Sequence, residues 1–79
     1  MKAFPNPFSN SITLDYAFKN SIGKTELKVF NVLGQVVEVQ HLDTMEGQLN
    51  LGTNWPSGVY FIQAYSDSKP IQYLKVIKQ

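Results

Sequence analysis

The chain has 79 residues, with seven lysines, no arginine, six acidic residues, a formal net charge of +1 and no cysteine. So small a positive charge without arginine argues against a nucleic-acid surface, and the lack of cysteine excludes disulfides and thiolate chemistry. No apolar run approaches the roughly 20 residues that a membrane-spanning helix needs. The length predicts one domain over residues 1–79, whose small core leaves most of the sequence committed to folding.

The proline-rich N-terminal segment, residues 1–10, contains Pro5-Asn6-Pro7. Proline removes a backbone donor and pushes the preceding residue into an extended conformation, so this segment cannot be a helix. We expect it to be stiff and to border a sheet. A linker at a domain boundary that packs its two phenylalanine rings is an equally good interpretation.

Residues 11–18 alternate between apolar and polar side chains, which predicts a half-buried strand. Its predicted inner face consists of Ile12, Leu14, Tyr16 and Phe18. Residues 24–31 predict a second strand, with Leu27 and Val29 facing inward.

A hairpin is predicted around Gly34, which can supply the positive φ of a bulged turn. The returning strand spans residues 35–42, and we expect Val37 and Val39 to face inward. A turn and a short strand over residues 48–51 follow.

The sequence Trp55-Pro56-Ser57-Gly58 predicts a sharp corner, because Pro56 fixes one turn dihedral and Gly58 supplies a positive one. Tyr60 lies just inside the next strand. Its ring can pack in the core while its hydroxyl reaches back to the corner backbone, as in the tyrosine corner of β-sandwiches.

Residues 58–78 predict a final hairpin whose two faces are both apolar. One face consists of Tyr60, Ile62, Ala64, Leu74 and Val76. The other consists of Val59, Phe61, Tyr73 and Ile77, interrupted by Gln63 and Lys75. Such strands are either covered on both sides or expose an adhesive patch.

Six to seven short strands separated by turns every 8–12 residues or so predict an all-β fold, a small immunoglobulin-like antiparallel β-sandwich. Catalytic residues are hard to find in it. His41 is the single imidazole, which excludes a two-histidine metal site. A serine nucleophile would need His41 as its base and a carboxylate behind it, and Asp43 would share the strand face of His41 only if the strand continued that far. The sequence therefore predicts a protein that is not an enzyme and binds no cofactor or metal.

Four blocks of the sequence carry a resemblance to a known family. They are Pro5-Asn6-Pro7-Phe8, residues 29–37 around Gly34, residues 55–62 around the Pro56-Ser57-Gly58-Val59-Tyr60 corner, and Lys75-Val76-Ile77-Lys78-Gln79. In this order, and covering nearly the whole chain, they resemble the C-terminal sorting domain of type IX secretion (Por secretion system) cargo. Trp55 is a departure, since many members have Leu there.

The resemblance implies a signal domain that the type IX translocon and its shuttle proteins recognise in a Gram-negative bacterium. Such domains follow an N-terminal cargo domain through the periplasm to the cell surface or medium, and a sortase-like peptidase usually removes them. Because Met1-Lys2-Ala3 directly precede the motif, we expect the cargo and the cleavage junction to be missing from this sequence.

The predicted recognition surface is the final hairpin, which offers an edge for strand addition and a set of tail and face residues. The set consists of Val59, Phe61, Tyr73, Lys75, Val76, Ile77 and Lys78. Alternatively the aromatic residues only cover the sheet and the lysines only protect an edge from aggregation. A second set is expected to define the fold: Pro5, Asn6, Pro7, Gly34, Pro56, Gly58 and Tyr60.

Two other functions are compatible with these residues. A carbohydrate-binding or fibronectin-like accessory module would use Trp55, Tyr65 and Tyr73 as stacking platforms. A purely structural spacer would need no binding surface. Whether the apolar stripe makes the isolated domain a homodimer is left open.

Overall fold

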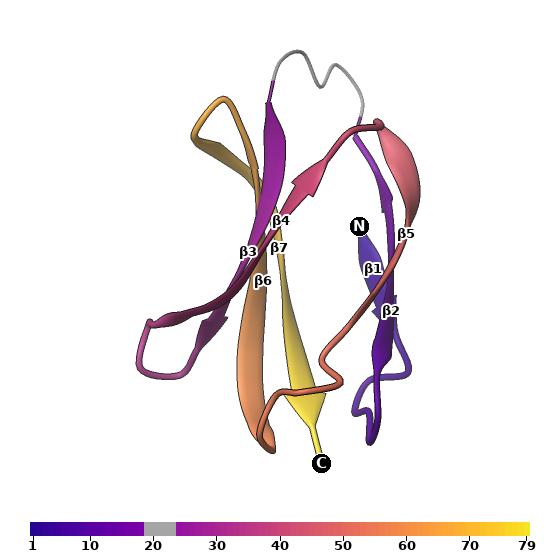
Figure 1. Ribbon diagram of the computed structural model, residues 1–79, viewed down its shortest axis with the longest axis vertical. Coiled ribbons are helices and arrows are strands. Elements are labelled where there is room, and N and C mark those ends of the chain that lie inside the picture. The colour runs from indigo at the N-terminus through magenta and orange to yellow at the C-terminus, as the bar shows by residue number, and fades with distance from the viewer. Residues whose placement is uncertain (19–23) are drawn as a thin grey trace.

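The computed structural model describes residues 1–18 and 24–79 as seven strands in two antiparallel sheets that face each other (Figure 1). The three-stranded sheet has the order β1 (Lys2–Phe4), β2 (Ile12–Ala17) and β5 (Glu46–Leu51). The four-stranded sheet has the order β4 (Val36–Leu42), β3 (Thr25–Asn31), β6 (Gly58–Ser66) and β7 (Lys69–Lys78). The prediction of an all-β sandwich is confirmed. Across the described ranges, no helix is long and apolar enough to span a bilayer.

The core lies between the inner faces of the two sheets. The predicted inner face of residues 11–18 is confirmed, since all four of its apolar side chains are buried. Leu27 and Val29 oppose them from β3 and are fully buried. The rest of the core comes from Phe8, Leu42, Leu51, Trp55, Tyr60, Ile62, Ala64 and Val76.

The contact predicted for Tyr60 at the corner before β6 is confirmed, whereas Gly58 is already part of β6, with a nearly extended φ of 159°. The Tyr60 ring is buried, and its hydroxyl donates a hydrogen bond of 2.5 Å to the Pro56 carbonyl oxygen. The ring centroids of Trp55 and Tyr60 lie 4.7 Å apart. The hydrogen bond and the ring contact together hold the chain where it passes from the three-stranded to the four-stranded sheet.

The inward orientation expected for Val37 and Val39 is wrong. Their exposed fractions are 41% and 43%, and the core side of β4 carries Glu38 and Gln40 instead. The cause is a register shift where β4 pairs with β3: Phe30 lies opposite Val36, but Val29 lies opposite Glu38. The extra residue reverses the alternation along the rest of the strand, as a β-bulge does.

The polar side chains on the core side of β4 are satisfied by hydrogen bonds. The Trp55 Nε1–H group donates to Glu38 Oε1 at 3.0 Å, and Gln40 Nε2 donates to Glu38 Oε2 at 2.7 Å. An inward-pointing charge with partners costs little and makes an edge strand a poor template for pairing with another chain.

Candidate recognition surface on the final hairpin

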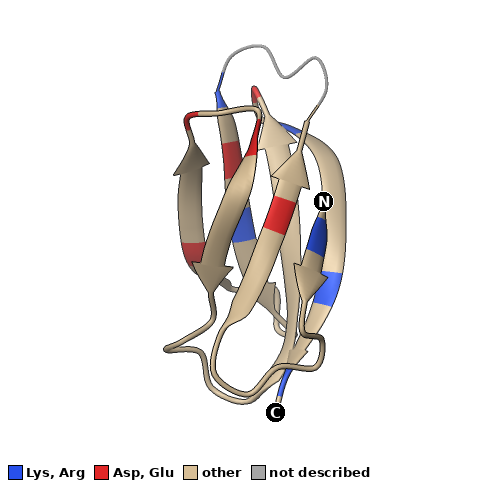
Figure 2. Cartoon of the chain, turned by 90° about the vertical axis from the view of Figure 1, so that its right-hand side faces the viewer, with Lys and Arg blue, Asp and Glu red and all other residues tan. Residues whose placement is uncertain are grey.

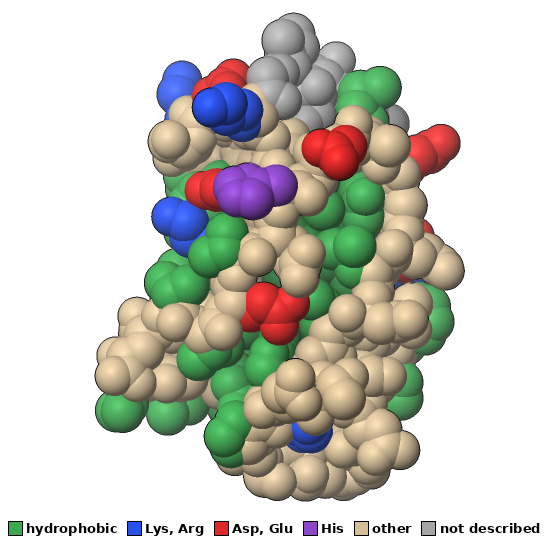
Figure 3. Space-filling model, in the orientation of Figure 1, with side chains coloured by type: hydrophobic (Ala, Val, Ile, Leu, Met, Phe, Trp, Pro, Cys, Tyr) green, Lys and Arg blue, Asp and Glu red, His purple; other side chains and the backbone are tan. Residues whose placement is uncertain are grey.

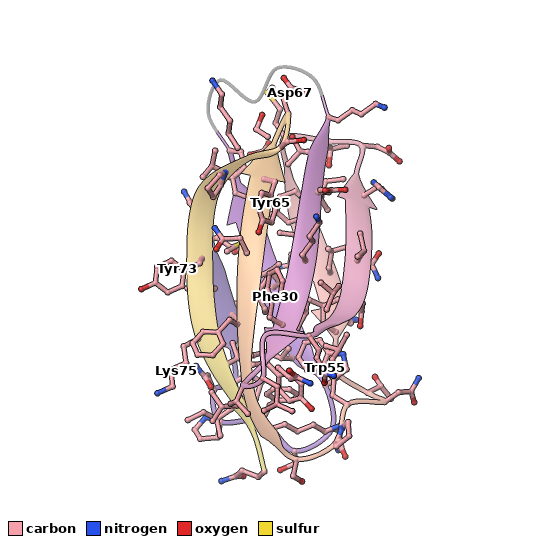
Figure 4. All side chains as sticks on the ribbon, turned by 90° about the vertical axis from the view of Figure 1, so that its left-hand side faces the viewer. Phe30, Trp55, Tyr65, Asp67, Tyr73 and Lys75 are labelled. Carbon is pink, nitrogen blue, oxygen red and sulfur yellow. The ribbon has the colours of Figure 1, made fainter. Side chains whose placement is uncertain are left out.

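The outer face of the β6–β7 hairpin brings together most of the predicted recognition residues. Val59 lies opposite Ile77, and Phe61 lies opposite Lys75. Tyr73 is one pair further along, opposite Gln63. Because residues opposite each other in an antiparallel pair share a face, these side chains form one stripe, which we call the outer stripe. Figure 4 shows this face of the sheet, with Tyr73 and Lys75 projecting from β7.

The outer stripe is accessible in the described structure. Tyr73 and Ile77 have exposed fractions of 67% and 37%, and Lys75 is exposed as well. Val59 and Phe61 lie on the same face of the adjacent strand β6 and are partly buried. The face continues onto β3, where Phe30 lies opposite Phe61 (Figure 4). A contiguous apolar face of this kind is a candidate interaction site.

Two of the predicted recognition residues point away from the outer stripe. Val76 is completely buried in the core. Lys78 Nζ donates hydrogen bonds to the carbonyl oxygens of Gly52 and Thr53 at 2.5 and 3.1 Å, so it closes the bottom of the sandwich. Side chains available to a partner are therefore those of Val59, Phe61, Tyr73, Lys75 and Ile77.

The edge of β7 expected to accept an added strand is occupied at its C-terminal end. The backbone of Phe8 and the side chain of Asn6 bond to the backbone of Lys75, Ile77 and Gln79. The expectation of a free edge is therefore wrong for this part of β7. At this end of β7 the hairpin therefore presents its face rather than its edge.

The predicted hairpin turn is built around Asn31 as well as Gly34. Gly34 has a φ of 83°, as expected. The Asn31 side-chain oxygen accepts hydrogen bonds from the backbone N–H groups of Leu33 and Gln35, both at 3.0 Å. This Asx-type arrangement stiffens the turn, and Leu33 at its tip is 79% exposed.

The three aromatic residues considered as sugar-stacking platforms do not form a common platform. Trp55 is only 7% exposed and packs edge-on against Phe8, with 6.0 Å between ring centroids. Tyr65 is partly buried, and its ring faces Lys28 Nζ at 5.1 Å from the centroid. Only Tyr73 of the three is exposed.

Charged residues are dispersed along the strands and loops of the described chain (Figure 2). An open pocket at the end of the sandwich is lined by Lys24, Glu26, His41, Asp67 and Ser68. Its carboxylates are engaged: Glu26 lies 3.6 Å from His41 Nδ1, and Asp67 Oδ1 accepts from the Lys24 N–H group. His41 lies at the surface (Figure 3), and the described ranges hold no cluster of metal-ligating side chains.

Packing of the N-terminal phenylalanine rings, one of the two interpretations of residues 1–10, is confirmed for Phe8 but not for Phe4, which is 44% exposed. The role of Gly52 was not predicted from the sequence. Phe8 is 1% exposed, and its ring lies so close to Gly52 that a Cβ there would stand 2.6 Å from Phe8 Cε2. The signal that was available is the phenylalanine directly after Pro5-Asn6-Pro7, which was assigned to a segment at the border of the fold.

A family model described as the secretion system C-terminal sorting domain matches residues 2–79. Neither a curated protein nor a solved structure matches the chain significantly.

Proposed function

The chain belongs to the secretion system C-terminal sorting domain family, and we propose that it carries its cargo through the type IX translocon by way of the outer stripe. The family is that of type IX sorting signals, whose carriers are exported to the cell surface or secreted. The cargo is the protein joined to the N-terminal side of the domain.

The observation that carries this proposal is the exposure of the outer stripe. Tyr73 and Ile77 are exposed beside Lys75 on one sheet face, and the partly buried Val59 and Phe61 continue the apolar surface on the neighbouring strand. Aromatic side chains such as Tyr73 are enriched at protein–protein interfaces and often dominate the binding energy. A receptor that accepts many cargoes has to recognise the sorting domain alone, and a rigid sheet face meets that need.

Passage through the periplasm and removal of the domain by a sortase-like peptidase complete the proposed route. The domain takes no catalytic part in it. Its one imidazole, His41, is 77% exposed at the side chain, and its Nδ1 atom lies 3.6 Å from Glu26 Oε2. Recognition and positioning are the work of this module, and the covalent chemistry belongs to its partners.

The test of the proposed function is a fusion experiment in a type IX-competent host. The domain is joined to the C-terminus of a fluorescent protein that carries an ordinary periplasmic signal peptide. We expect fluorescence at the cell surface or in the medium with the domain, and retention in the periplasm without it. A second fusion, carrying an unrelated β-sandwich of similar size, controls for a spacer effect.

Retention of the correctly folded fusion in the periplasm would contradict the proposal. Equal export with the unrelated sandwich would show that the domain is only a spacer. Binding of the purified domain to a polysaccharide panel, combined with retention, would favour the accessory-module function instead.

A further inference from the structure

The N-terminal segment runs along the outer edge of β7 at the end of the chain. Phe8 forms a parallel bridge with Lys78. The Phe8 N–H group donates to the Ile77 carbonyl oxygen at 2.9 Å, and the Gln79 N–H group donates to the Phe8 carbonyl oxygen at 2.8 Å. Two backbone hydrogen bonds therefore attach the two ends of the domain to each other.

The side chain of Asn6 repeats the same pattern two residues earlier. Its Nδ2 atom donates to the Lys75 carbonyl oxygen at 3.1 Å, and its Oδ1 atom accepts from the Ile77 N–H group at 3.0 Å. A carboxamide carries one acceptor and one donor group side by side, so it can replace a peptide group. The Asn6 side chain thus makes with Lys75 and Ile77 the pair of contacts that the backbone of Phe8 makes with Ile77 and Gln79.

These contacts hold the last residues of β7 against the N-terminal segment. A terminal strand is poorly ordered unless it is tied down. On one edge β7 pairs with β6 as far as Lys78, and on the other Asn6 and Phe8 cover residues 75–79. Phe8 is buried in the core, so the attachment is anchored, whereas Asn6 is exposed and can be changed without opening the core.

We propose that Asn6 is a positioning residue for the tail: it fixes the backbone of Lys75 and Ile77 so that their side chains stand in the outer stripe. The same contact closes the edge, so the partner binds the side chains of this face and does not add a strand to the end of β7. This inference rests on the proposed function, because it assumes that the outer stripe is what the secretion system recognises.

The variant Asn6→Ala removes both side-chain hydrogen bonds, and Asn6→Asp keeps only the acceptor for the Ile77 N–H group. Asn10→Ala is the matched control, since Asn10 is an exposed asparagine of the same segment with no hydrogen bond in the described structure. Hydrogen exchange measured by NMR reports on each amide separately. We expect the Ile77 amide to exchange roughly tenfold faster in Asn6→Ala, which corresponds to the loss of one ordinary hydrogen bond. Exchange in the β2 and β3 strands should be unchanged.

Export of the fluorescent fusion is measured with the same variants. We expect Asn6→Ala to lower export several-fold although the domain stays folded, Asn6→Asp to lower it less, and Asn10→Ala to leave it unchanged. If the unaltered fusion is not exported, the proposed function itself fails. If it is exported and Asn6→Ala is exported equally well or better, the positioning role is overturned, and better export would indicate strand addition at the freed edge. Unchanged exchange at Ile77 would overturn it as well. Should Asn6→Ala prevent folding, Asn6→Asp provides the same comparison.

Discussion

Gly34 and Gly52 share a backbone conformation but differ in their surroundings. Their φ angles are 83° and 90°, both in the left-handed region that disfavours any side chain. A Cβ at Gly34 would meet nothing within 4 Å, whereas at Gly52 it would meet the Phe8 ring at 2.6 and 2.8 Å. Gly34 is therefore needed for its dihedral angle alone, and Gly52 also for the space that Phe8 fills.

We expect Gly34→Ala to lower the free energy of unfolding by about 1–2 kcal/mol, the cost of a left-handed alanine. For Gly52→Ala the clash with a ring packed in the core adds about 1–3 kcal/mol. Urea unfolding followed by tryptophan fluorescence compares the two. Equal losses would mean that Phe8 moves aside freely, and that its packing does not hold the N-terminal segment in place.

For single residues, the sequence predicted contacts between residues that lie close together in the chain. The contact of the Tyr60 hydroxyl with Pro56 spans four positions and follows from the corner motif. The partners of Asn6, in contrast, are 69 and 71 positions away. Pro5-Asn6-Pro7 showed that this segment is extended, but only the fold shows which backbone its amide contacts.

Strands β2 and β4 show when the alternation of apolar and polar residues predicts which side chains face the core. In β2 every second residue is apolar and the burial follows it. In β4 the sequence Val36-Val37-Glu38-Val39 contains one more residue than the ladder uses, and pairing with β3 decides which side chains turn inward. A bulge is a property of two strands together, so the sequence of one strand does not locate it.

The end of β7 separates two lysines that looked equivalent in the sequence. Lys78 Nζ donates to two backbone carbonyl oxygens, whereas Lys75 lies exposed in the outer stripe. We expect Lys78→Met to lower the free energy of unfolding by about 1.5–3 kcal/mol, because the hydrogen bonds lost are to a charged donor. Lys75→Met should change it by no more than about 0.5 kcal/mol.

Urea unfolding of the two variants checks this expectation, and export of their fusions checks its consequence. A folded Lys75→Met domain with reduced export would place Lys75 in the recognition surface. A Lys78→Met domain as stable as the unaltered one would mean that its contacts with Gly52 and Thr53 contribute nothing.

In the whole domain, the N-terminal segment and the last strand lie side by side along one edge of the four-stranded sheet. The N-terminal amino group of Met1 donates to Gln72 Oε1 at 2.9 Å, and Phe8 bonds to Gln79. The strand number and the two-sided final hairpin followed from the sequence. Which hairpin face stays exposed did not, because that depends on how the second sheet is placed. As a result, one face of the β6–β7 hairpin packs against the three-stranded sheet and the other face, the outer stripe, is exposed to solvent.

The most direct measurement is the export of a fusion whose outer stripe has been made polar. Tyr73→Ser combined with Ile77→Thr removes the two most exposed apolar groups of the stripe and keeps Lys75 and the core. The control is Val32→Thr combined with Met45→Ser, two residues that are 66% and 58% exposed elsewhere. We expect both proteins to unfold at nearly the same urea concentration, and only the first to remain in the periplasm. Equal export of the two would contradict recognition through the outer stripe.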